Sequence, residues 1–252
     1  MSLVGKTNKQ KKCIFIYATA GFNDRFVLKS NLIKFLEDKV EKIVIFSTLG
    51  DLPEYKKAVS KTNVIVEKLK EDQYEKYFKR NRVARLLTLF RQFIHNGKYN
   101  TFIVDWFRSI FINQNISNRK LTGKFIGFIW EIMSILFKSS FILRKIMIWL
   151  ESRIFVINPH KELFDLYNPD LVVVSALSGV KYNENFAREA KRNGVKVCCV
   201  MGSWDYAIGL GMPGFEPDFI SAWNKDMKTD LITLNDINEK KIKIKSHKIF
   251  GR

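Results

Sequence analysis

The residues most able to do chemistry follow a short apolar segment near the carboxyl end of the chain. Val195–Val200 is typical of a buried strand, and it leads into a loop of small, aromatic and acidic residues: Gly202, Ser203, Trp204, Asp205 and Tyr206. An indole offers a rigid stacking face, a carboxylate can accept a hydrogen bond or act as a base, and glycine allows a ligand to approach the backbone. Open α/β sheets place ligand sites at the carboxyl ends of their strands. We therefore expect a ligand site here. The structural alternative is that Trp204 packs against a core edge and Asp205 caps the next turn.

A second loop with candidate ligand residues, Ala18–Asp24, follows the first apolar segment. It contains one glycine and lacks the G-x-G-x-x-G pattern, so it does not predict a dinucleotide site. A glycine loop that opens a helix can still bind an anion through free backbone N–H groups. The alternative interpretation is a plain turn in which Asn23 or Asp24 is the N-cap of the following helix. The residues expected to contact a ligand from this loop are Gly21, Phe22, Asn23 and Asp24.

Three more residues are expected at the same edge. Ser175 and Ser178 follow the apolar segment Leu171–Val174, so they would face the ligand beside Trp204. Asn224 follows another apolar segment and either contacts the ligand or caps the helix that begins after it.

The elements that must position these loops alternate along the chain. Seven segments are predicted as strands: Cys13–Tyr17, Lys42–Ser47, Asn63–Leu69, Leu171–Val174, Val195–Val200, Phe219–Trp223 and Lys241–Lys245. Helical periodicity marks the segments Arg25–Lys39, Pro53–Ser60, Tyr182–Asn193 and Lys225–Leu234, with Gly194 as a C-terminal stop. This alternation predicts an α/β fold, namely a Rossmann-like parallel sheet. We expect one domain over 1–252, with a first part at 12–70, a helical insertion at 71–157 and a second part at 158–252.

The insertion combines apolar and basic residues. Lys124, Glu131, Lys138 and Lys145 recur every seven residues, which places them on one polar stripe of a helix that is otherwise apolar. Its uncharged runs fall short of the ~18–20 residues that cross a bilayer. Two interpretations remain open, a helix buried in a large core and a helix that lies in a membrane interface. In the second, the residues expected to face the membrane are Lys124, Lys138, Arg144, Lys145, Trp130 and Trp149.

Composition limits the class of partner. The chain has 43 Lys and Arg against 25 Asp and Glu, a net charge of +18, which favours an anionic partner. Its three cysteines fall in predicted strands and form no C-x-x-C pair, which is typical of a reducing compartment. The three histidines have no zinc-ligand spacing, so we expect no metal site.

Several motifs together resemble a known family. Pro169–Ser175, the S-W-D-Y loop Gly202–Tyr206 and the W-N-containing segment Pro217–Lys228 resemble the amino-terminal half of a GT-B-type glycosyltransferase. They are similar to bacterial surface-polysaccharide enzymes and to CDP-glycerol glycerophosphotransferase-like proteins. Those sequences carry an S-W-D-N-like loop, and this chain has Tyr206 where they have Asn.

The resemblance implies an acceptor-binding half of a membrane-associated enzyme. The nucleotide-activated donor would bind a second domain that is expected to be absent here, so we expect no cofactor in this chain. The chain would then be either a truncated or split product, or one half of a two-chain enzyme with a donor-domain partner. The implied partners are an anionic or lipid-linked saccharide acceptor and the anionic inner face of the cytoplasmic membrane, which makes the protein cytoplasmic and peripheral. Glycosyl transfer needs a base to deprotonate the acceptor hydroxyl, and Asp205 and Asp24 are the candidates.

Two alternatives stay open. One is a sugar-nucleotide epimerase-like enzyme of the same fold, because fold alone does not identify function. The other is a basic nucleic-acid-binding module. The sequence disfavours the second, because the positive charge concentrates in an Ile-, Phe- and Leu-rich segment.

Overall fold

The protein is an α/β structure whose sheet is all parallel. The computed structural model describes residues 12–18, 32–59, 63–98, 102–112, 121–179 and 182–244. Within these residues, seven strands form one sheet in the order β3-β2-β1-β4-β5-β6-β7. The strands are β1 (Cys13–Ala18), β2 (Lys42–Ser47), β3 (Val64–Lys68), β4 (Leu171–Val174), β5 (Lys196–Val200), β6 (Phe219–Ala222) and β7 (Ile242–Ile244). The predicted Rossmann-like parallel sheet is confirmed, and the strand bounds differ from the expected ones by no more than a residue or two.

Both faces of the sheet are covered, which explains why its strands are continuous apolar runs. In β1 the side chains alternate, so Phe15 and Tyr17 enter one core with Phe186, while Ile14 and Ile16 enter the other. The helices around the sheet are α2 (Leu32–Glu37), α3 (Pro53–Val59), α9 (Lys161–Tyr167), α10 (Asn183–Arg192), α11 (Tyr206–Gly209) and α12 (Lys225–Thr233). The expected stop after α10 is also found, since Gly194 has a φ of 76°, a left-handed conformation that suits glycine.

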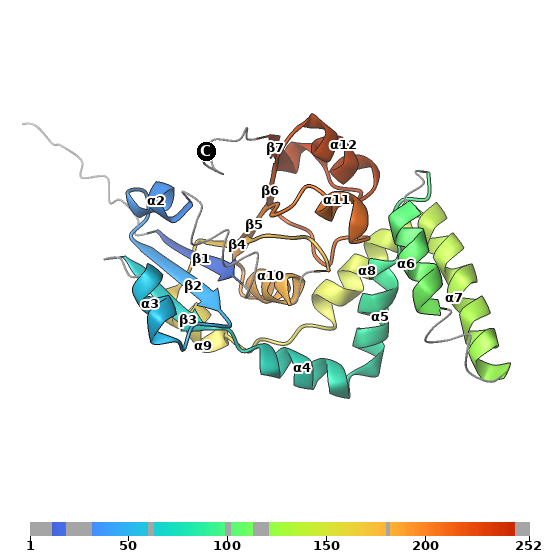
Figure 1. Cartoon of the computed structure of the whole chain (residues 1–252), viewed down its shortest axis with the longest axis horizontal. Coiled ribbons are helices and arrows are strands. Elements are labelled where there is room, and N and C mark those ends of the chain that lie inside the picture. Colours follow the sequence, from blue (N-terminus) through green and yellow to red (C-terminus); the bar gives the residue numbers. More distant parts are fainter. Residues whose placement is uncertain are drawn as a thin grey trace, which may run out of the picture.

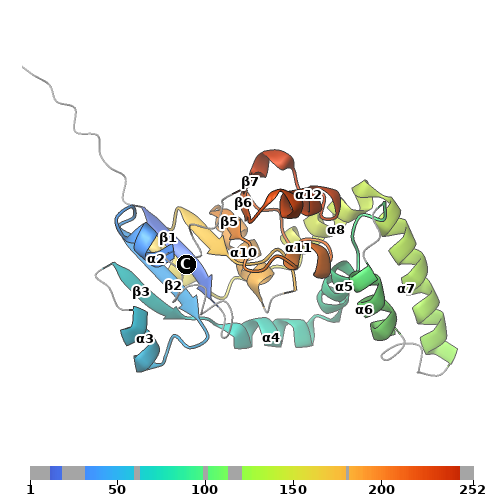
Figure 2. The ribbon, with the colours of Figure 1, turned by 45° about the horizontal axis from the view of Figure 1, so that its top comes forward.

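The helical insertion forms the far end of the molecule. Its helices are α4 (Glu71–Arg80), α5 (Arg82–Gln92), α6 (Phe102–Ile112), α7 (Leu121–Ser139) and α8 (Phe141–Arg153). Helix α4 runs from the β3 side of the sheet to the opposite end, where α5, α6, α7 and α8 gather (Figures 1 and 2). The insertion therefore adds a separate helical layer beyond the sheet, with its own small apolar cluster around Phe90 and Met147.

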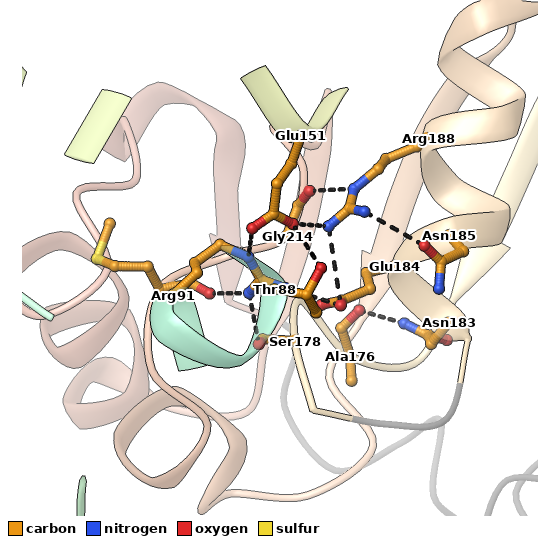
Figure 3. A network of polar contacts seen from close by, with 11 residues as sticks. Thr88, Arg91, Glu151, Ala176, Ser178, Asn183, Glu184, Asn185, Arg188 and Gly214 are labelled. Carbon is orange, nitrogen blue, oxygen red and sulfur yellow. Dashed lines mark hydrogen bonds and ion pairs between the residues drawn. The ribbon is translucent and has the colours of Figure 1, made fainter. Parts of the chain in front are cut away.

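A buried ionic network joins this layer to the sheet domain. Arg91 of α5 and Glu151 of α8 meet Glu184 and Arg188 of α10, and all four side chains are at most 5% exposed (Figure 3). The Nε of Arg91 lies 2.9 Å from Glu151 Oε1, and its Nη2 lies 2.7 Å from Glu184 Oε1. Arg188 contacts the other oxygen of Glu151. Two cations thus meet two anions away from water.

The same arginines also fix backbone and loop atoms. Arg91 Nη1 donates to Ser178 Oγ at 2.8 Å and to the carbonyl oxygen of Met212 at 2.5 Å. Arg188 Nε donates to the carbonyl oxygen of Gly214 at 2.6 Å. Burial disfavours the charged form of Arg91, but the two glutamates outweigh burial and raise the pKa of Arg91. The two arginine side chains therefore hold the loop before β6 against the insertion.

We expect Glu151→Gln to destabilise the protein strongly. The substitution keeps the side-chain shape but leaves two buried guanidinium groups with only Glu184 as a counter-ion, and breaking a buried ion pair costs about 3–5 kcal/mol. Urea unfolding measures the change in the free energy of unfolding. The matched control is Glu162→Gln on the exposed side of α9, which should stay within about 0.5 kcal/mol of the parent protein. Equal stabilities for the two variants would contradict a stabilising role for the network.

Candidate functional site

The carboxyl edge of the sheet brings two of the predicted loops together. The chain leaves β1 toward β2 and leaves β4 toward β5, so the strand order reverses between β1 and β4. Ligands of open α/β sheets bind in the crevice at such a switch point. The loop after β4 begins at Ser175, and the loop after β5 contains Gly202, whose N–H donates to the Ser175 carbonyl oxygen at 2.8 Å. Gly21, Phe22, Asn23 and Asp24 follow β1 but lie outside the described residues.

Ser175 is buried at the switch point, with 3% of its surface exposed. Its backbone N–H donates to Asn183 Oδ1 at 3.3 Å, and Asn183 Nδ2 donates to the carbonyl oxygen of Ala176. The Ser175 hydroxyl has no hydrogen-bond partner within the described part of the chain. A buried hydroxyl without a partner is costly, so this group is available to a ligand atom that enters the crevice. The role of Asn183 in holding the loop after β4 was not predicted from the sequence, because an Asn at the start of a helix is usually an N-cap.

The loop after β5 presents Trp204 and Asp205 to solvent. Trp204 is 63% exposed, so it does not pack against a core edge. Asp205 is exposed as well, and its side chain makes no capping hydrogen bond to α11. The packing alternative for Trp204 is therefore wrong, whereas Asp205 does occupy the N-cap position of α11, through its backbone carbonyl rather than its side chain. An exposed indole can stack on a sugar ring, and the carboxylate beside it can accept a proton from a sugar hydroxyl.

The two ends of this loop are held by contacts with the sheet domain. Trp223 Nε1 donates to the carbonyl oxygen of Met201 at 2.6 Å, and the half-buried Tyr206 packs against the main core. Burial and the neighbouring Asp205 carboxylate together raise the pKa of Tyr206. Ser203 is half-buried, and a Cβ added to Gly202 would lie 3.4 Å from the Ser175 carbonyl oxygen, an ordinary contact. Glycine is therefore not required at position 202 by packing within the protein.

Two predicted ligand residues have structural roles instead. Asn224 Oδ1 accepts from the Met227 N–H at 2.8 Å, which makes it the N-cap of α12 as in the alternative interpretation. Ser178 is 2% exposed and accepts from Arg91, so it belongs to the buried network rather than to the crevice.

Helix α7 directs Glu131, Ser134 and Lys138 toward the protein, while most of its apolar residues point outward. Lys138 pairs with Asp105 of α6, and Glu131 Oε2 lies 3.7 Å from Arg108 Nη2. Gly127 and Ser134 are buried on the same side. The outward side chains are 38–64% exposed, and they are Phe125, Ile126, Phe128, Ile129, Ile132, Met133, Ile135 and Leu136. The interpretation of α7 as a core helix buried on most sides is therefore wrong.

The residues expected to face a membrane differ in how far their side chains are exposed. Lys124 and Trp149 are exposed, whereas the Lys138 side chain is only 15% exposed and Trp130 packs edge-on against Phe90 at 5.2 Å between ring centroids. Lys145 lies between these extremes, with 31% of its side chain exposed.

Arg144 does not face outward. It is 2% exposed, its Nε lies 2.6 Å from Asp236 Oδ2, and its Nη1 donates to the carbonyl oxygen of Phe137 at 3.0 Å. The helix breaks at Ser140, where the two segments are bent by 107°, so Arg144 does not continue the outward surface of α7. Among the described residues, no single helix is long and apolar enough to cross a bilayer, although Lys124–Ser139 and Phe141–Arg153 together meet the requirements of length and composition.

The described residues contain no group of three or more His, Cys, Asp or Glu side chains placed to hold a metal ion. No protein-family model matches this chain, and no curated protein matches it.

We expect Asp205→Asn to lower the pKa of Tyr206. The carboxylate disfavours the tyrosinate, so removing its charge eases deprotonation, while burial keeps the pKa above the ordinary tyrosine value. NMR titration of ¹³Cζ-labelled tyrosine measures this shift. The control Asp226→Asn, on the exposed side of α12, should leave it unchanged. An unaltered Tyr206 titration in Asp205→Asn would show that the carboxylate does not face the ring.

Proposed function

We propose that this chain is the acceptor-binding half of a membrane-associated glycosyltransferase, or of a glycerophosphotransferase-like enzyme, that makes cell-surface polysaccharide. The observation that carries the proposal is the inverted pattern of α7, whose apolar side chains point away from the protein. A helix of this kind is attached to a sheet whose carboxyl edge presents an indole and a carboxylate. One chain thus combines an outward apolar helix, suited to a membrane, with a candidate acceptor site.

The exposed face of α7 favours lipid as its surroundings. Soluble monomers rarely leave contiguous apolar patches of more than a few hundred Å² in water. Full burial of a Phe or Ile side chain stabilises by about 1.5–3 kcal/mol, and several such side chains lie together on α7. The net charge of +18 adds attraction to anionic lipids, so the helix is expected to lie in the interface at the inner face of the cytoplasmic membrane.

The carboxyl edge supplies groups suited to a saccharide acceptor. Trp204 offers a stacking face, Ser175 offers a hydroxyl that has no partner among the described residues, and Asp205 is the proposed base for the acceptor hydroxyl. Asp24 remains the second candidate base. The activated donor would come from a donor-domain partner, and the acceptor would be anionic or lipid-linked.

Membrane association is tested by flotation with vesicles. We expect the parent protein to float with vesicles that contain anionic lipid, and Phe128→Ser combined with Ile132→Ser to reduce the bound fraction about tenfold or more, because both side chains lie on the outward face. The matched control is Leu166→Ser, which removes an equally exposed apolar side chain from α9 and should float like the parent. Absence of flotation by the folded parent protein would refute membrane association.

Acceptor binding is tested with two kinds of vesicle, one carrying a polyprenyl-diphosphate-linked saccharide and one carrying the same polyprenyl diphosphate without sugar. The parent protein should prefer the saccharide. Trp204→Ala should reduce that preference about tenfold while flotation persists, because the stacking face is lost. The control Phe219→Ala removes an exposed aromatic side chain at the opposite edge of the sheet. No preference for the saccharide in the parent protein would exclude the acceptor role.

A further inference from the structure

A second hollow lies at the amino edge of the sheet, away from Trp204 and Ser175. We call it the amino-edge pocket; its volume is about 700 Å³, and it opens between α8, the end of α10 and the segments that precede β6 and β7. Because Arg192, Glu216 and Lys241 each come shortly before a strand, this pocket faces the edge opposite the switch point. It is therefore a site separate from the acceptor crevice.

The pocket is strongly cationic. Among the described residues that line it, five are basic and one is acidic: Lys145, Arg153, Lys191, Arg192, Lys241 and Glu216. The three lysine side chains are only 30–37% exposed, so their charges are partly removed from water. Such a concentration of positive charge in a concave, partly desolvated place favours an anion.

The anions of the protein do not neutralise this charge. Glu216 Oε1 lies 2.9 Å from Lys241 Nζ and 4.0 Å from Lys145 Nζ, and Lys191 pairs with Asp218 at 2.8 Å. Arg192 donates only to the carbonyl oxygen of Val156, at 3.3 Å. Within the described part of the chain, neither Arg192 nor Arg153 forms an ion pair. Two guanidinium groups thus remain for a ligand.

A buried hydroxyl in the same pocket also lacks a partner. Ser134 and Ser139 of α7 each donate to the carbonyl four residues earlier, at 2.8 Å. The Oγ of Ser152 is buried but makes no hydrogen bond to any described residue. A serine hydroxyl beside arginine side chains is the donor set that proteins use for phosphate oxygens.

The surface beside the pocket indicates what kind of molecule would carry the phosphate group. Ile142, Ile146 and Trp149 form one outward stripe of α8, and they are 68%, 45% and 56% exposed. Trp149 also lines the pocket. The apolar stripe therefore ends at the cationic hollow, an arrangement that suits a molecule with a phosphate group and a hydrocarbon chain.

We propose that the amino-edge pocket binds the phosphomonoester group of a membrane lipid, with Arg153, Arg192 and Ser152 as its ligands and the lipid chain along the outward stripe of α8. This inference rests on the proposed membrane association but not on glycosyl transfer. Phosphate bound here would orient the protein on the bilayer at a point separate from the acceptor crevice.

Vesicle binding with charge-matched variants tests the proposal. The pocket variant Arg153→Gln with Arg192→Gln and the control variant Lys76→Gln with Lys79→Gln on exposed α4 each remove two positive charges. On vesicles with phosphatidate, whose phosphate is a monoester, the pocket variant should bind at least about tenfold more weakly than the parent, and the control should change about twofold or less. On phosphatidylserine vesicles the two variants should lose affinity equally. Equal losses on both kinds of vesicle would overturn the proposal, because they would reflect net charge alone.

Inorganic pyrophosphate separates a lipid source from a soluble one. With Trp149 fluorescence as the readout and Trp149→Phe as the blank, we expect pyrophosphate to bind weakly and to compete with phosphatidate vesicles in the parent but not in the pocket variant. Tighter binding of pyrophosphate than of phosphatidate vesicles would overturn the lipid assignment. If the folded parent does not float on any vesicle, the proposed membrane association fails; a pyrophosphate signal that the pocket variant loses would then still support a phosphate site here.

Discussion

Two arginines and two glutamates with almost no exposed surface hold the helical insertion against the sheet domain. Charges removed from water are tolerated only when they are paired and hydrogen-bonded, so Arg91, Glu151, Glu184 and Arg188 admit few alternative arrangements. The network fixes parts of both the insertion and the sheet domain. It places α5 and α8 beside α10, and it pins the backbone at Met212 and Gly214 through the arginine side chains.

The consequence is a fixed frame that joins two different surfaces. The outward face of α7 belongs to the insertion, and the amino-edge pocket lies between α8 and the amino edge of the sheet, whereas Ser175 and Trp204 follow the carboxyl ends of β4 and β5. The carboxyl edge presents an indole, a hydroxyl and a carboxylate, and the amino edge presents mostly cations. The sheet thus separates an edge with a stacking face and hydrogen-bonding oxygens from an edge rich in cations.

The sheet could be predicted from sequence because its strands are buried on both faces. Leu171–Val174 reads as a strand without knowledge of its neighbours, and the strand-end positions of Ser175 and Gly202 follow from it. Which side of helix α7 faces the rest of the protein could not be predicted in the same way. The seven-residue spacing of Glu131 and Lys138 reveals a stripe, but only Asp105 and Arg108 of α6 decide that the stripe faces inward.

Partners distant in the sequence account for the remaining corrections. Arg144 is buried because it finds Asp236, ninety-two residues later, and Ser178 leaves the crevice because Arg91, eighty-seven residues earlier, binds it. A basic residue in an apolar segment and a serine after a strand give no sign of such partners. Pairing across this distance is a property of the folded chain.

The inverted pattern of α7 also sets how the protein behaves in solution. Away from lipid, its apolar side chains favour contact with one another on neighbouring molecules, and the net charge of +18 opposes such contact by long-range repulsion. Added salt weakens this repulsion, since the screening length falls to about 10 Å at 0.1 M and to about 3 Å at 1 M. The hydrophobic attraction persists as the repulsion fades. We therefore expect colloidal stability to be greatest in dilute buffer, and concentrated salt to favour association of the molecules through the exposed apolar face of α7.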